Sequence, residues 1–244
     1  MKEIIVRKLH LDGIPISIYE TQDTTDKPLI FSFHGFDGYK DGDYFKREDD
    51  LARLGFIVVG LDSILHGERR IAPFEAKSYE EKMKDINHCI CQSAIDAISL
   101  YEKYLKYMPR VKPNEVYAIG VSMGGAISIY MSTLYPLKKA VSIVGSPSMV
   151  DFYKMKQKKY GWEEDFYYER NMAYYAQLDP SEHMDKIKCP LFLTAGIQDE
   201  VIPLQLIQSF TKDNITVKTY DTGHMPNQVQ FDDAYHFLLS KEDV

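Results

Sequence analysis

The sequence predicts an α/β fold whose mostly parallel central sheet is flanked by helices on both faces. Short apolar runs typical of strands alternate along the chain with segments whose apolar residues recur at helical spacing. Strands that alternate with helices imply a parallel sheet covered on both sides. The chain has 244 residues, 45% of them hydrophobic, which is enough for one sizeable core. We therefore expect residues 1–244 to form a single domain.

The first half of the chain follows this alternation. Two strands surround Asp12-Gly13, a good two-residue hairpin turn. A helix ends at Gly55, just before a buried strand. A long helix then carries one apolar face from Met83 to Leu105. In order, the predicted segments are strands 3–10, 14–20 and 28–35, helix 43–55, strand 56–62 and helix 79–108.

The second half repeats the pattern with one interruption. Residues 147–188 are charged and unusually aromatic and have no strand periodicity. They are either two amphipathic surface helices or a small aromatic-rich cap inserted over a pocket, with Trp162 and Tyr167 as candidate substrate-binding residues. The other predicted segments are strand 115–122, helix 123–135, strands 138–146 and 190–196, a helix from about Pro203, strand 215–221 and a helix from about Pro226 to Ser240.

Composition excludes several classes of protein. The formal net charge of −7 argues against a nucleic-acid surface. No apolar run approaches the roughly 20 residues that span a bilayer, and the first residues lack the apolar segment of a signal peptide. The three cysteines fit thiols in a reducing cytoplasm, and Cys89-x-Cys91 has no partners at zinc-ligand spacing. We expect a cytoplasmic protein without a bound metal, while the sequence leaves open whether it forms a homo-oligomer.

One short turn carries the main chemical signal. Gly120-Val121-Ser122-Met123-Gly124 follows a predicted strand and precedes a predicted helix, the context of a nucleophile elbow. So tight a turn excludes bulky neighbours, which explains a glycine two positions to either side of the serine. Ser122 is therefore the candidate nucleophile.

A serine hydroxyl needs a base to take its proton and an acid to orient that base. His224 follows the last predicted strand, and Asp199 follows the preceding core strand. The chain order Ser122, Asp199, His224 is one that this chemistry uses. Asp221 is the reserve acid, and Glu200 would point elsewhere if Asp199 points inward. Four other histidines compete with His224 for the role of base, but they fall on strands, helices or the cap and are expected to be structural or solvated: His10, His88, His183 and His236.

The residues after the third predicted strand complete the candidate site. The backbone amides of Phe36 and Met123 are the expected oxyanion donors, and Gly35 permits close approach. His34 either bonds within its own loop or contacts the substrate. After the fourth strand, Asp62, His66 and Arg69 are expected to support the loop rather than to act in catalysis.

These segments resemble the α/β-hydrolase superfamily along nearly the whole chain. Residues 31–70, with "GLDSILHGERR" at their end, look like the branch of dienelactone hydrolases and prolyl-oligopeptidase-like esterases, and "GVSMGG", "GIQDEVIP" and "TGHMP" match the superfamily's nucleophile, acid and histidine loops. The resemblance implies Ser122 as nucleophile, His224 as base and Asp199 as acid. Dienelactone hydrolases use cysteine at the elbow, so Ser122 favours ordinary carboxylesters, and without the propeller domain of oligopeptidases the chain favours an esterase over a peptidase.

We expect a serine carboxylesterase that acts on small to medium acyl esters through an acyl-enzyme and needs no cofactor. The same triad would serve a thioesterase, an acyltransferase or a deacetylase of decorated sugars. A non-catalytic binding module is the remaining alternative, disfavoured because such a module would have no need of all three triad residues.

Overall fold

Eight strands form one sheet in the part of the chain that the computed structural model describes, residues 2–42 and 47–240. The strand order is β1-β2-β4-β3-β5-β6-β7-β8. β1 and β2 form an antiparallel hairpin, β2 pairs antiparallel with β4, and the other pairings are parallel. The strands are Ile4–Leu11 (β1), Ile14–Thr21 (β2), Lys27–Phe33 (β3), Ile57–Leu61 (β4), Val111–Val121 (β5), Lys139–Ile143 (β6), Leu191–Gly196 (β7) and Ile215–Tyr220 (β8). The predicted fold class is confirmed.

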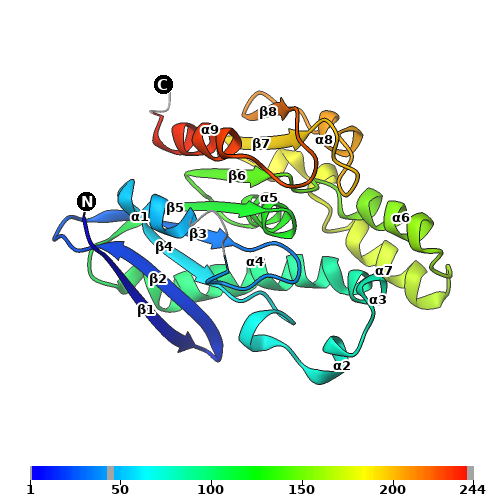
Figure 1. Cartoon of the computed structure of the whole chain (residues 1–244), viewed down its shortest axis with the longest axis horizontal. Coiled ribbons are helices and arrows are strands. Elements are labelled where there is room, and N and C mark those ends of the chain that lie inside the picture. The colour runs from blue at the N-terminus through cyan, green and yellow to red at the C-terminus, as the bar shows by residue number, and fades with distance from the viewer. Residues whose placement is uncertain (1, 43–46, 241–244) are drawn as a thin grey trace.

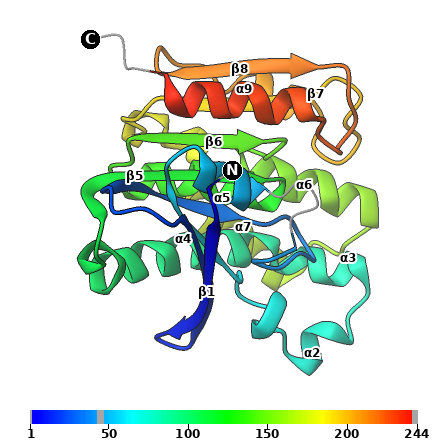
Figure 2. The ribbon, with the colours of Figure 1, turned by 60° about the vertical axis from the view of Figure 1, so that its left-hand side comes forward.

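Helices cover both faces of the sheet (Figure 2). Along β3, Phe31 packs toward α4 and α5, and its neighbour Ile30 packs toward α1 and α9, because successive strand residues face opposite sides. The helices are Arg47–Arg53 (α1), Ala72–Glu75 (α2), Tyr79–Lys82 (α3), Ile86–Lys103 (α4), Met123–Leu134 (α5), Met149–Tyr160 (α6), Phe166–Ala176 (α7), Gln205–Gln208 (α8) and Gln228–Leu239 (α9).

Most differences from the predicted elements lie in the helices. The single helix predicted over 79–108 is wrong: a 3-10 turn at Met83–Asp85 separates α3 from α4, and another at Leu105–Tyr107 follows α4. The predicted start is confirmed, because Ser78 caps α3 with a capping box and the helix begins at Tyr79. α2 was not predicted, and the helix expected from Pro203 is only the short α8. Residues 43–46 of the helix predicted over 43–55 lie outside the described residues.

The carboxyl ends of the parallel strands share one edge of the sheet. In Figure 1, the arrowheads of β5, β6 and β7 point toward α6 and α7, which lie beyond that edge. These two helices occupy the segment predicted as an insertion, between β6 and β7. Loops that follow parallel strands meet at this edge, so it is where the predicted site residues come together. The cap role of 147–188 stays a prediction.

Candidate active site

Ser122 sits on a strained turn between β5 and α5. Its backbone has φ 56° and ψ −116°, a conformation that side-chain-bearing residues rarely adopt. The amide of Ser122 donates to the carbonyl of Ile143 on β6 at 2.8 Å, and the carbonyl of Ser122 accepts from the amide of Ala126 at 3.1 Å. The turn is therefore tied to the sheet on one side and to the helix on the other. Such a turn exposes the hydroxyl at the carboxyl edge of the sheet.

The flanking glycines are required by close backbone contacts. A Cβ atom on Gly120 would lie 2.2 Å from the carbonyl carbon of Gly124, and one on Gly124 would lie 2.2 Å from the carbonyl oxygen of Phe33. Both distances are far too short for a contact between non-bonded atoms, so neither position can carry a side chain. α5 thus begins directly against the end of β3, which brings Ser122 beside the loop that follows this strand.

The structure brings the three predicted triad residues within hydrogen-bond distance. His224 Nε2 lies 2.9 Å from Ser122 Oγ, and His224 Nδ1 lies 2.8 Å from Asp199 Oδ2. The residues come from three loops, after β5, β7 and β8. A carboxylate only accepts hydrogen bonds, so Asp199 holds the imidazole with its proton on Nδ1 and leaves Nε2 facing the hydroxyl.

Asp199 is held as a carboxylate by its own loop. Its Oδ1 accepts hydrogen bonds from the amides of Val201 at 2.8 Å and Ile202 at 2.9 Å. Burial opposes ionisation, but the hydrogen bonds from His224 and these amides outweigh it and keep the pKa of Asp199 below its ordinary value. Asp199 is therefore charged wherever His224 acts as a base.

The competing acids lie elsewhere. Asp221, the predicted reserve acid, accepts a hydrogen bond from the side chain of Gln198 at 2.7 Å on the surface. Glu200 is exposed and follows the buried Asp199. The geometry therefore favours Asp199 as the partner of His224.

His34 anchors the loop after β3. Its Nε2 accepts from the amide of Ser63 at 3.1 Å, and its Nδ1 lies 2.7 Å from the carbonyl of Gly35. Phe36 follows this anchored turn, and its ring packs edge-on against the ring of Tyr79. Phe36 and Met123 both border the cavity beside Ser122, where their amides would face a developing oxyanion. Their donor role stays a prediction.

The loop after β4 is a structural support, as predicted. Asp62 is fully buried and accepts from the amides of Lys40 at 2.8 Å and Glu68 at 2.9 Å. Arg69 donates to the carbonyl of Asp62 at 3.2 Å and to the Asp96 carboxylate at 2.7 Å. These contacts fix the loop on which the amide of Ser63 meets His34.

A cavity of about 360 Å³ opens beside Ser122 and His224. Its apolar lining includes four residues of the α3–α4 segment and one each from α5 and α6, namely Tyr79, Met83, Ile86, Ile90, Ala126 and Phe152. His34, predicted as a substrate-binding residue, also borders the cavity. The helical wall carries no distinct signal in the sequence, because buried lining residues repeat at the same spacing as a core-facing stripe.

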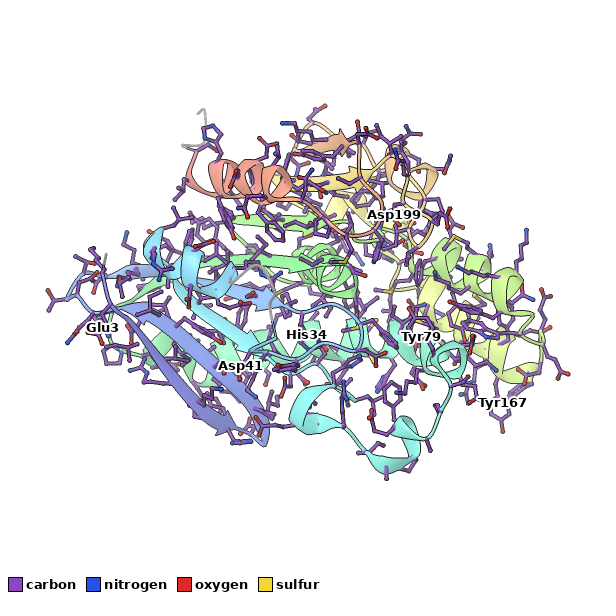
Figure 3. All side chains as sticks on the ribbon, viewed as in Figure 1. Glu3, His34, Asp41, Tyr79, Tyr167 and Asp199 are labelled. Carbon is purple, nitrogen blue, oxygen red and sulfur yellow. The ribbon has the colours of Figure 1, made fainter. Side chains whose placement is uncertain are left out.

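Trp162 and Tyr167 border a different hollow, next to Lys84, Asp85 and Tyr153. Trp162 is buried and packs against Tyr153 with 5.1 Å between ring centroids. Figure 3 places Tyr167 at the outer side of α7, well away from His34 and Asp199. Of the predicted cap aromatics, the structure therefore brings neither to the cavity at Ser122. Phe152, an aromatic residue of the same 147–188 segment, does border it.

Cys89 and Cys91 are buried on α4, and burial raises the pKa of each thiol to about 12, so neither is a ready thiolate nucleophile. In the described ranges, His, Cys, Asp and Glu side chains nowhere gather in a group of three or more that would hold a metal ion. None of the described helices combines the length and apolar composition that a membrane crossing requires.

A sequence model of the dienelactone hydrolase family matches residues 16–242. The chain belongs to this family. It is a hydrolase with a serine at the nucleophile turn. A search of curated proteins returns no match.

Solved structures share the fold at low sequence identity. TT1662 from Thermus thermophilus is 16% identical with a TM-score of 0.72, and the alignment covers 98% of this chain and 100% of that one. Acetyl xylan esterase 1 from Thermoanaerobacterium is 20% identical with a TM-score of 0.69, covering 98% and 88%. An esterase from Pyrococcus furiosus is 17% identical with a TM-score of 0.65, covering 97% and 90%. At these identities the likeness shows the α/β-hydrolase fold.

Proposed function

We propose that this family member is a serine carboxylesterase that hydrolyses small to medium acyl esters. The observation that carries the proposal is the chain of two hydrogen bonds from Asp199 through His224 to Ser122. It supplies the base that a serine hydroxyl needs and the acid that orients that base.

In the first half of the reaction, Ser122 Oγ attacks the ester carbonyl while His224 Nε2 takes the hydroxyl proton. The carbonyl oxygen gains negative charge and accepts hydrogen bonds from the amides of Phe36 and Met123, each worth about 3–4 kcal/mol in oxyanion holes of this kind. His224 then gives its proton to the departing alcohol. Ser122 is left as an acyl ester.

In the second half, His224 takes a proton from water, which attacks the acyl carbonyl. Collapse of the second tetrahedral intermediate breaks the bond to Ser122 Oγ, and His224 returns the proton to the hydroxyl. A carboxylic acid leaves and the enzyme is restored. The apolar wall around Ile86 and Phe152 suits an aliphatic acyl chain.

Substitution of the nucleophile tests the proposal. Ser122→Ala should abolish turnover of p-nitrophenyl acetate and butyrate while leaving thermal unfolding unchanged. A fluorophosphonate probe should label the wild type and not the variant. Full activity in the variant, or no labelling of the wild type, would show that the proposal is wrong; the second result would favour a binding module.

A deacetylase of acetylated sugars is the second candidate, since structures with this fold include two proteins described as acetyl xylan esterases. A thioesterase or an acyltransferase would use the same triad. Rates on acetylated xylan, acyl-CoA and simple alkyl esters, measured side by side with Ser122→Ala as the blank, separate these substrates.

A further inference from the structure

Lys156 is a buried cation that the reaction described above does not use. It lies on α6, and only 2% of its surface is exposed. The lysines at 154, 158 and 159 of the same helix are exposed. Burying an ammonium group without a carboxylate partner is unfavourable, so its position calls for an explanation.

The contacts of Lys156 lead to the catalytic acid. Its Nζ donates to the carbonyl of Val201 at 3.1 Å. The amide of the same residue donates to Asp199 Oδ1 at 2.8 Å, and Asp199 Oδ2 meets His224 Nδ1 at 2.8 Å. Val201 thus links the two residues: its carbonyl accepts the hydrogen bond from Lys156, and its amide donates to the Asp199 carboxylate.

Lys156 also borders the wall of the cavity. Its Nζ lies 4.8 Å from the centre of the Phe152 ring, one turn earlier on α6. Phe152 and Val201 both line the cavity beside Ser122. The ammonium group therefore sits behind two residues that a substrate would touch. Among the described residues it makes this ring contact and one hydrogen bond and forms no ion pair.

We propose that Lys156 is a positioning residue for the reaction: it fastens helix α6 to the loop of Asp199 and keeps that carboxylate aligned with His224. This inference rests on the proposed function, because it assigns Asp199 the role of catalytic acid. The carbonyl of Val201 is the point of attachment. A substrate that contacts Phe152 would touch the same helix, α6, that Lys156 holds against this carbonyl.

The energetics of the buried charge separate this role from a purely structural one. Burial and, to a smaller extent, the charge of Lys159 together lower the pKa of Lys156 to about 8, while the Asp199 carboxylate opposes the change. Because the pKa is lower in the folded state than in the unfolded chain, the charged lysine costs stability at pH 7, and this cost falls as the pH rises above about 8. A residue kept only for stability would not be placed at such a cost.

Two substitutions and a matched control test the proposal. Lys156→Met keeps the approximate length of the side chain and removes the donor. We expect kcat for p-nitrophenyl butyrate to fall by on the order of 10-fold, since small misplacements of catalytic groups have effects of this size or larger, with KM nearly unchanged. Thermal unfolding at pH 7 should occur at the wild-type temperature or above it. Lys156→Arg, which retains a donor, should recover part of the loss, and the exposed Lys159→Met should behave as wild type.

Each contrary result overturns the proposal. Wild-type kcat in Lys156→Met would show that the hydrogen bond to Val201 does not position the acid. A fall in kcat together with a fall in unfolding temperature of several degrees, or failure to fold, would show a structural role instead. An inactive Ser122→Ala beside a fully active Lys156→Met would remove the positioning role alone, whereas an active Ser122→Ala would remove the proposed function as well.

Discussion

The ring of His34 accepts a hydrogen bond from the backbone amide of Ser63, with 3.1 Å between Nε2 and N. An amide only donates, so Nε2 carries no proton and Nδ1–H donates to the carbonyl of Gly35 at 2.7 Å. The neutral imidazole therefore joins the loop after β3 to the loop after β4 on one side of the cavity. Burial lowers the pKa of His34 to about 4, in agreement with this neutral form.

This tautomer predicts how stability depends on pH. The folded protein keeps His34 neutral down to about pH 4, whereas the unfolded chain takes up the proton near the ordinary histidine value of 6.5. The unfolded state binds more protons in this window, so the free energy of unfolding should fall from pH 6.5 to about 4, by up to about 3 kcal/mol from His34.

Urea denaturation at several pH values measures this slope. His34→Gln offers an acceptor to Ser63 without titrating and should flatten the slope. Burial also lowers the pKa of His66, which contributes in the same direction and will leave part of the slope in the variant. An identical slope in the two proteins would contradict the assignment.

Removing the charge of Asp199 should reduce turnover much more than it reduces substrate binding. Asp199→Asn leaves the imidazole without the partner that fixes its tautomer, and we expect kcat to fall by on the order of 10⁴-fold. Asp221→Asn is the matched control, because Asp221 bonds Gln198 rather than His224. Steady-state kinetics of both variants decide which acid serves the histidine, and a larger loss in Asp221→Asn would exchange their roles.

The wild-type activity should fall in acid. The pKa of Asp199 lies below its ordinary value, so loss of the catalytic base, and not of the acid, should limit the reaction as the pH falls. kcat/KM measured from about pH 8 to about pH 5 should therefore decrease. A profile that stays flat on the acidic side would argue against histidine as the base.

The elbow should not tolerate a methyl group. Gly124→Ala would place its Cβ 2.2 Å from the carbonyl oxygen of Phe33, and we expect a loss of at least about 3 kcal/mol of stability. Gly161 has φ +64° but open space around the added atom, so Gly161→Ala should cost only about 1 kcal/mol. Chemical denaturation of Gly124→Ala and Gly161→Ala measures the two free energies of unfolding and so separates a steric clash from an unfavourable backbone conformation. Equal losses of stability in the two variants would refute the steric explanation.

The depth of the cavity should set the preference for acyl length. Ile90 lies on the apolar wall and is 3% exposed. Ile90→Phe shortens the space, and we expect the ratio of kcat/KM for butyrate over acetate to fall by about 10-fold. A series of p-nitrophenyl esters provides the measurement. An unchanged ratio would place the acyl chain elsewhere in the cavity.

The sequence was sufficient to predict which loops meet. Ser122, Asp199 and His224 each follow a run of apolar residues that reads as a buried strand, and the ends of parallel strands share one edge. The glycine spacing around Ser122 identified the turn, and the structure supplies the backbone contacts that require it. Their catalytic roles are part of the proposed function.

The walls of the cavity were not predictable in the same way. Ile86 and Ile90 have the spacing of a core-facing helix, and nothing local shows that part of that face borders a cavity. The aromatic residues of the insertion could not be assigned to the cavity from sequence either. Trp162 packs against Tyr153, a contact within the insertion that no sequence pattern shows. Lys156 belongs to a run of surface-like lysines, and only the fold shows that it turns inward.

The edge position of β8 makes ester hydrolysis a probe of local unfolding in the sheet. β8 is the last strand in the sheet order and pairs with β7, and His224 follows it directly. The amide of Gln198 also donates to the carbonyl of Thr222 at 3.0 Å, which links the two loops that carry the acid and the base. Edge strands are held by one neighbour and open at lower free energy than central ones. Opening of β8 would displace His224 before the rest of the sheet unfolds. In mild denaturant, ester turnover should therefore disappear before the helical circular dichroism signal does.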